Sequence, residues 1–154
     1  MLYFDSSALI KHYVLETGSE TIGHKLRDEE KASKPVFTSV LTFAEIQAAL
    51  SRRAKDNSLP PREYVRVRTR FESDWVSGLT PIDLGPDVLG IVRGVVDQFV
   101  LRGADVVHLA SAIWLRDLST LNVSEAVCFL SSDKQLAKAA AKSHLEVFNP
   151  EAGN

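Results

Sequence analysis

The chain has 154 residues, a length that fits one domain with a core large enough to fold by itself. Hydrophobic residues make up 45% and charged residues 25% of it, which are ordinary values for a globular protein and give no sign of extended disorder. The formal net charge of −2 argues against bulk electrostatic attraction to nucleic acid, but it leaves room for a local basic surface.

The single cysteine, Cys128, rules out an intramolecular disulfide and suits a reducing compartment. The N-terminus lacks a basic region followed by a long apolar stretch, and no window approaches the roughly 18 apolar residues of a membrane span. We therefore expect a cytoplasmic protein without a membrane span. It should form a single domain over 1–150 with a short C-terminal tail over 151–154.

Short apolar runs alternate with longer segments of helical period along the first half of the chain. A strand is predicted at 2–4, followed by a helix that begins near Ser6 or Ser7, either of which can serve as its N-cap. The pattern then predicts a helix over 19–30, a strand over 35–40 and a helix over 42–55.

The second half continues the alternation. A helix is expected to begin at Pro60–Pro61, because proline is tolerated in a first turn. The remaining predicted elements are a weak strand at 79–84, helices at about 87–101 and 105–117, a clear strand at 125–132, a helix from Asp133 to about Lys142 and a last strand at 145–148. Strands separated by helices imply parallel pairing, so the expected fold is a three-layer α/β/α sandwich with an about five-stranded, mostly parallel sheet.

Four carboxylates are predicted at one edge of this sheet, where open parallel sheets bind their ligands. Asp5 follows the first strand, Glu45 lies in the first turn of the helix after the second strand, Asp105 opens a helix, and Asp133 follows the strand at 125–132. Each aspartate also has a purely structural explanation as a helix cap or first-turn acid. Glu45 has a weaker one, because its neighbours are apolar or small.

Clustered carboxylates repel one another, so such a cluster is costly without a cation. Mg²⁺ and Mn²⁺ prefer hard oxygen ligands, and one or two such ions can activate a water for attack on a phosphodiester. Ser6 and Ser131 flank the same edge and could hold a water or a phosphate oxygen, although capping and turn formation explain them equally well.

Four stretches, "YFDSSALIKHY", "TSVLTFAEIQAALSR", "LRGADVVHLASA" and "FLSSDKQLAKAA", occur in an order that resembles the PIN-domain ribonucleases, particularly the VapC-type toxins of prokaryotic toxin–antitoxin pairs. The resemblance covers 2–148. It implies a four-acid site at Asp5, Glu45, Asp105 and Asp133, with Asp5 and Asp105 as the most direct metal ligands. Ser131 stands where the family often has threonine, which keeps the hydroxyl in place.

The same resemblance implies an endoribonuclease that depends on Mg²⁺ or Mn²⁺. It also implies a homodimer that is inhibited by a small VapB-like antitoxin.

A basic segment lies between residues 52 and 70. Its candidate contacts for RNA or for an antitoxin are Arg52, Arg53, Arg62, Arg66 and Arg70. On a helix, the last three line one face, while the opposite apolar side is expected to be core or a dimer contact. A solvated basic face with no partner is the competing interpretation.

Other functions are compatible with an acidic edge on an α/β sheet. A phosphatase-like hydrolase would use Asp5 as nucleophile, but that chemistry commonly wants a second aspartate where Ser7 stands. A receiver-like signalling module would need a lysine after a late strand, and Lys134 matches poorly. A non-catalytic PIN-like binding module is the remaining alternative. His108 follows Asp105 by one turn and could reach the edge, yet we expect it to be a polar or surface residue.

Overall fold

The computed structural model describes residues 1–122 and 125–152. Its strands are β1 (Leu2–Phe4), β2 (Val36–Ser39), β3 (Thr80–Ile82), β4 (Cys128–Leu130) and β5 (Glu146–Phe148). Its helices are α1 (Ser6–Leu9), the short 3₁₀ helix η1 (Ile10–His12), α2 (Ser19–Lys31), α3 (Leu41–Lys55), α4 (Pro61–Ser77), α5 (Pro86–Gln98), α6 (Gly103–Asn122) and α7 (Lys134–Lys142).

The strands form one five-stranded sheet in the order β3-β2-β1-β4-β5, and every pairing is parallel. The first strand is therefore central, with Leu2 paired to both Val36 and Cys128. Because the strands are parallel, their carboxyl ends meet at one edge. This architecture confirms the α/β/α sandwich expected from the alternation of strands and helices.

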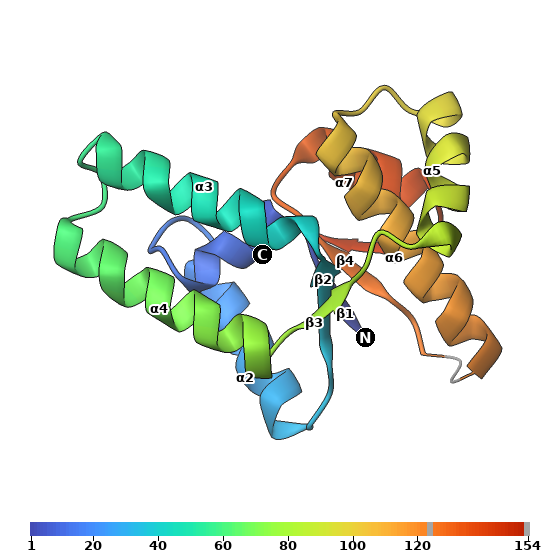
Figure 1. Ribbon diagram of the computed structural model, residues 1–154. Coiled ribbons are helices and arrows are strands. Elements are labelled where there is room, and N and C mark those ends of the chain that lie inside the picture. Colours follow the sequence, from blue (N-terminus) through green and yellow to red (C-terminus); the bar gives the residue numbers. More distant parts are fainter. Residues whose placement is uncertain (123–124, 153–154) are drawn as a thin grey trace.

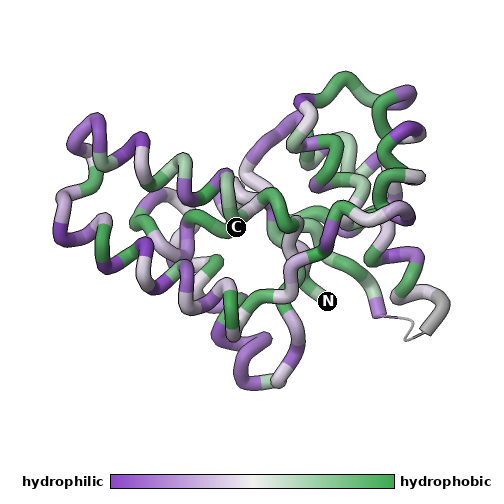
Figure 2. Tube along the Cα trace, in the orientation of Figure 1, coloured by the Kyte–Doolittle hydropathy of each residue, from purple (hydrophilic) through white to green (hydrophobic). Residues whose placement is uncertain are grey.

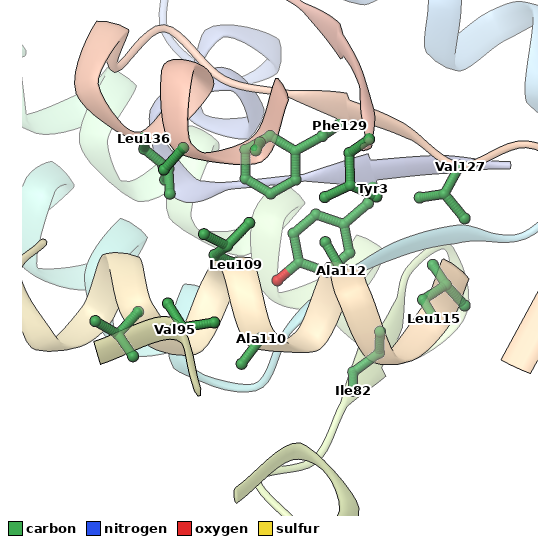
Figure 3. Close-up of a cluster of buried hydrophobic side chains, with 14 of the residues drawn as sticks. Tyr3, Ile82, Val95, Leu109, Ala110, Ala112, Leu115, Val127, Phe129 and Leu136 are labelled. Carbon is green, nitrogen blue, oxygen red and sulfur yellow. The ribbon is translucent and has the colours of Figure 1, made fainter. Parts of the chain in front are cut away.

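Helices cover both faces of the sheet (Figure 1). On one face, Tyr3 and Phe129 pack with Leu109, Val95 and other residues of α5, α6 and α7 (Figure 3). The alternate strand positions face the other way and pack against α1 to α4, with fully buried members such as Phe4 and Phe71. Since successive strand residues point to opposite faces, a sheet that is covered on both faces needs continuous apolar runs like "LYF".

Two features of the sequence prediction are wrong in detail. The first helix is capped by Asp5, whose side chain accepts a hydrogen bond from the backbone N–H of Ala8, and not by Ser6 or Ser7. The strand expected over 125–132 is limited to Cys128–Leu130, because its partner β1 offers only three residues for pairing. None of the helices in the described part of the chain has the length and apolar run that a membrane crossing requires.

Candidate metal and nuclease site

Asp5 is held in place by donors from three directions. Its carboxylate accepts hydrogen bonds from the Ala8 backbone N–H at 2.8 Å, from the Ser7 hydroxyl at 2.8 Å and from the Ser131 hydroxyl at 2.6 Å. Only 3% of the residue is exposed. Burial raises the pKa of Asp5, while the His108 ring and these donors act in the opposite direction.

Ser7 and Ser131 connect the end of β1 to the turn after β4. The Ser7 hydroxyl, which donates to Asp5, accepts the backbone N–H of Ser132 at 2.9 Å. The Ser131 hydroxyl likewise accepts the backbone N–H of Asp133 at 3.0 Å. The two hydroxyls therefore tie two of the acidic residues into one hydrogen-bonded network. Ser6 has a different place, on the wall of the adjacent groove.

Asp133 is the N-cap of α7. One oxygen of its carboxylate accepts the backbone N–H groups of Gln135 at 2.8 Å and Leu136 at 2.9 Å. Asp133 therefore does have the capping role that the sequence allows, as expected for aspartate, a preferred N-cap. Asp133 lies just after β4, at the carboxyl edge of the sheet, and Oδ1 is the oxygen that these two N–H groups bind.

Asp105 lies in the first turn of α6 and is partly buried. Burial and the nearby Asp133 carboxylate raise its pKa, whereas the Arg102 backbone, His108 and the Arg102 guanidinium lower it. The charge of Asp133, the N-cap of α7, thus acts on Asp105 in the first turn of α6.

Glu45 is bound by a histidine. Its Oε2 lies 2.7 Å from Nε2 of His108, and the Nδ1 atom of the same ring lies 3.1 Å from the Tyr3 hydroxyl. His108 is only 1% exposed, so it is not a surface histidine, and both ring nitrogens make polar contacts. Its position three residues after Asp105, which places both on one face of α6, was the signal that it could reach the edge.

The four acids lie at the same edge of the sheet, but their carboxylates do not converge on a single position. His108 bonds to Glu45 and acts electrostatically on both Asp5 and Asp105, so it lies among three of the four acids. Within residues 1–122 and 125–152, no three His, Cys, Asp or Glu side chains are grouped as they would be around a metal ion. The chemistry of the donors nonetheless fits a hard divalent cation, since all four are carboxylates and two of them repel each other.

A groove of about 600 Å³ opens beside these residues, between the α1–η1 segment and α3. Ser7, Glu45 and Ser132 line its end at the acidic edge, and Arg52 and Arg53 line it further along α3. The groove therefore joins the candidate site to part of the basic segment.

The five arginines of the basic segment differ in their partners, although Arg62, Arg66 and Arg70 lie four residues apart on the exposed side of α4. Arg53 is paired with Glu16 at 2.6 Å, Arg66 with Glu63 at 3.1 Å, and Arg70 contacts Asp74 at 3.9 Å and His12 at 2.7 Å. Arg52 and Arg62 are exposed and form no ion pair with any described residue. The apolar side of α4 is core, because Val67 and Phe71 are buried.

The fold and this acidic edge define a PIN-like α/β/α sandwich. No protein-family model matches the chain. Two proteins of Mycobacterium tuberculosis are similar to it, "Ribonuclease VapC45" of strain CDC 1551 / Oshkosh and "Ribonuclease VapC49" of strain ATCC 25618 / H37Rv. Each is 33% identical to it over 117 residues, which is 76% of this chain and 78% of the relative. The chain belongs to the VapC family of PIN-domain proteins.

Proposed function

We propose that the protein is the toxin of a toxin–antitoxin pair and that it cuts RNA phosphodiester bonds as a Mg²⁺- or Mn²⁺-dependent endoribonuclease. The observation that carries the proposal is the gathering of acidic side chains at the carboxyl edge, where the Ser131 hydroxyl bonds both the buried Asp5 carboxylate and the Asp133 backbone, and His108 bonds Glu45. Carboxylates brought together in this way are stabilised by a divalent cation. The two similar mycobacterial proteins are named ribonucleases, which supports the same activity.

In this proposal, Asp5 and Asp105 are the most direct metal ligands, and Glu45 and Asp133 complete or support the site. The bound cation would supply a Lewis acid for the phosphodiester and a water of lowered pKa. The chain's own contribution is to orient the oxygens. Ser7 and Ser131 hold Asp5 by hydrogen bonds, and the first N–H groups of α7 hold Asp133. Fixed ligands of this kind need no rearrangement when charge develops in the transition state.

The test is cleavage of a mixed RNA pool by the purified, partner-free protein. We expect cleavage with Mg²⁺ or Mn²⁺, none with EDTA, and a loss of about 100-fold or more in Asp105→Asn, equivalent to several kcal/mol of transition-state stabilisation. Cleavage that survives both EDTA and the substitution would contradict the metal mechanism. Calorimetric titration with Mn²⁺ provides a second readout, because absent metal binding would favour a non-catalytic binding module.

Within the basic segment, we propose Arg52 as the residue that contacts RNA phosphate. It lies on the same groove as Glu45 and has no carboxylate partner among the described residues, whereas Arg53, Arg66 and Arg70 are already paired. An antitoxin segment that covered this groove would compete with RNA for the same arginine. Arg62, which is also unpaired, lies at the start of α4 and does not line the groove.

This assignment is tested by RNA binding to catalytically silent protein, with Asp105→Asn as background. Arg52→Ala should weaken binding and reduce the slope of log affinity against log salt by about 1, because one phosphate contact is lost. Arg66→Ala removes an exposed arginine that is paired within its own helix, and it serves as the matched control. Equal losses in the two variants would instead indicate diffuse attraction by a solvated basic face.

We further propose that the protein acts in the cytoplasm as a homodimer and is inhibited by a small VapB-like antitoxin. A dimer surface is offered by the region from Leu84 to Val100, which includes α5. Four large apolar side chains are exposed there, Leu84, Leu89, Val96 and Val100. In Figure 2, hydrophobic and hydrophilic stretches alternate along α5, and the loop after it is hydrophobic.

A further inference from the structure

His108 joins two parts of the carboxyl edge that come from opposite faces of the sheet. It projects from α6, which packs on the face covered by α5 to α7, and it reaches Glu45 on α3, which packs on the other face. Tyr3, in the central strand β1, supports the ring from behind with its hydroxyl at 3.1 Å. In Figure 3 the Tyr3 hydroxyl points toward α6.

With a neutral His108 ring, both hydrogen bonds run in one direction. An ionised carboxylate can only accept, so Nε2 of His108 carries the hydrogen in the 2.7 Å contact with Glu45. Nδ1 of the neutral ring is then an acceptor, and the Tyr3 hydroxyl, which is protonated at neutral pH, donates to it. Tyr3 therefore donates to His108, and His108 donates to Glu45.

The position of the Glu45 carboxylate depends on this series of hydrogen bonds, whereas each of the other acids has other partners. Asp5 has two hydroxyls and a backbone N–H, Asp133 has two backbone N–H groups, and Asp105 has the Arg102 backbone. For Glu45, His108 is the one hydrogen-bond partner found among the described residues. The Glu45 side chain is also 30% exposed and borders the groove, so without the ring it is free to turn into solvent.

We infer that His108, itself held by Tyr3, is a positioning residue that fixes the Glu45 carboxylate for metal binding and RNA cleavage. The inference rests on the proposed function and adds a part to it. His108 does not touch the reacting atoms in this assignment. It acts through Glu45, as outer-sphere partners do when they orient the ligands of a metal site.

Two substitutions of His108 distinguish the roles of its two ring nitrogens. Gln can place an N–H near the position of Nε2 and so keep a donor for Glu45, whereas Asn reaches only to the position of Nδ1 and loses that donor. We expect His108→Asn to lower kcat and Mn²⁺ affinity by about 10- to 100-fold with little change in KM for RNA. His108→Gln should recover most of both, and Tyr3→Phe should cause a smaller loss than His108→Asn.

A double-mutant cycle with Glu45→Gln decides whether the effect passes through Glu45. If it does, adding His108→Asn to Glu45→Gln should cost no further activity, and the free energies of the two single variants should not add. Full additivity, or wild-type activity in His108→Asn, would overturn the inference. If His108→Asn fails to fold, the comparison of Tyr3→Phe and His108→Gln with wild type keeps the same test.

Calorimetric titration with Mn²⁺ keeps this inference separable from the proposed function. A wild-type protein that binds Mn²⁺ but cuts no RNA would contradict the ribonuclease assignment, while weaker Mn²⁺ binding in His108→Asn would still support positioning. Undiminished Mn²⁺ affinity in His108→Asn, together with normal cleavage, would remove the role of His108 and leave the ribonuclease assignment intact.

Discussion

The environment of Asp105 predicts a cost to folding stability at neutral pH. Its pKa is raised by burial and by Asp133, so the folded state holds a proton at this site more tightly than the unfolded chain does. The ionised carboxylate therefore destabilises the fold at a pH above the raised value. The cost disappears as the pH falls below the ordinary aspartate pKa of about 3.9. Functional sites commonly carry such a cost.

We therefore predict that Asp105→Asn raises Tm at pH 7 in EDTA although it removes activity. Because Asp105 is only partly buried, screening limits the gain to about 1 kcal/mol or less, which is about 2–4 °C for a chain of this size. Thermal unfolding by circular dichroism at several pH values measures it, and the difference from wild type should vanish near pH 3.5. A lower Tm in the variant at pH 7 would instead show that the Arg102 backbone makes Asp105 stabilising.

At the scale of single residues, the sequence located the acids better than it located their partners. Asp5, Glu45, Asp105 and Asp133 each follow a predicted strand or begin a predicted helix, so topology alone places them at one edge. The roles of Ser7, Tyr3 and His108 depend on side-chain contacts between distant segments. His108 is 63 residues from Glu45 and 105 from Tyr3 in the chain, and no local pattern encodes those distances.

Helix α7 shows how one residue can serve both an element and the site. Asp133 caps it with two hydrogen bonds to backbone N–H groups, and its charge also acts on Asp105. Asparagine caps a helix about as well as aspartate does, but it carries no charge. Alanine neither caps the helix nor carries a charge. The two substitutions therefore separate capping from site chemistry.

We predict that Asp133→Ala destabilises the protein by about 1 kcal/mol, whereas Asp133→Asn leaves its stability within a few tenths of that of wild type. Both variants should lose RNA cleavage, because both remove the carboxylate. Urea unfolding and cleavage assays on the same preparations measure the two effects. Full cleavage by Asp133→Asn would mean that Asp133 is a cap and nothing more.

The lengths of the elements were harder to predict than their order. Apolar residues continue through 126–130, so the composition favours a longer strand than β4. The strand is short because pairing to β1 ends at Phe4, after which Asp5 turns the chain into α1. Strand length is thus set by the partner strand, which a single segment does not reveal. Most helix ends were predicted to within a few residues, because a helix forms its hydrogen bonds within its own segment.

For the whole molecule, each of the two helical layers supplies part of the proposed site. Figure 1 shows α3 and α4 extending away from the sheet on one side, while α5 to α7 pack on the other. The groove and the basic segment belong to the side of α3 and α4. Glu45 comes from the first layer and Asp105 and Asp133 from the second, so the proposed site forms only when both layers pack on β1. A protein of this design couples its activity to complete folding.

The α5 side also carries the surface that we assign to the homodimer, and this assignment gives the last prediction. Leu89 and Val96 are 51% and 55% exposed and lie seven residues apart, on one face of α5. Val96→Glu would bury a charge in a dimer contact, which costs several kcal/mol and weakens association by about 100-fold or more. Val76→Glu on α4, at a residue that is 85% exposed, is the matched control. Light scattering after size exclusion should give a monomer for Val96→Glu and a dimer for wild type and Val76→Glu. A dimer that survives Val96→Glu and is lost in Val76→Glu would move the interface to α4.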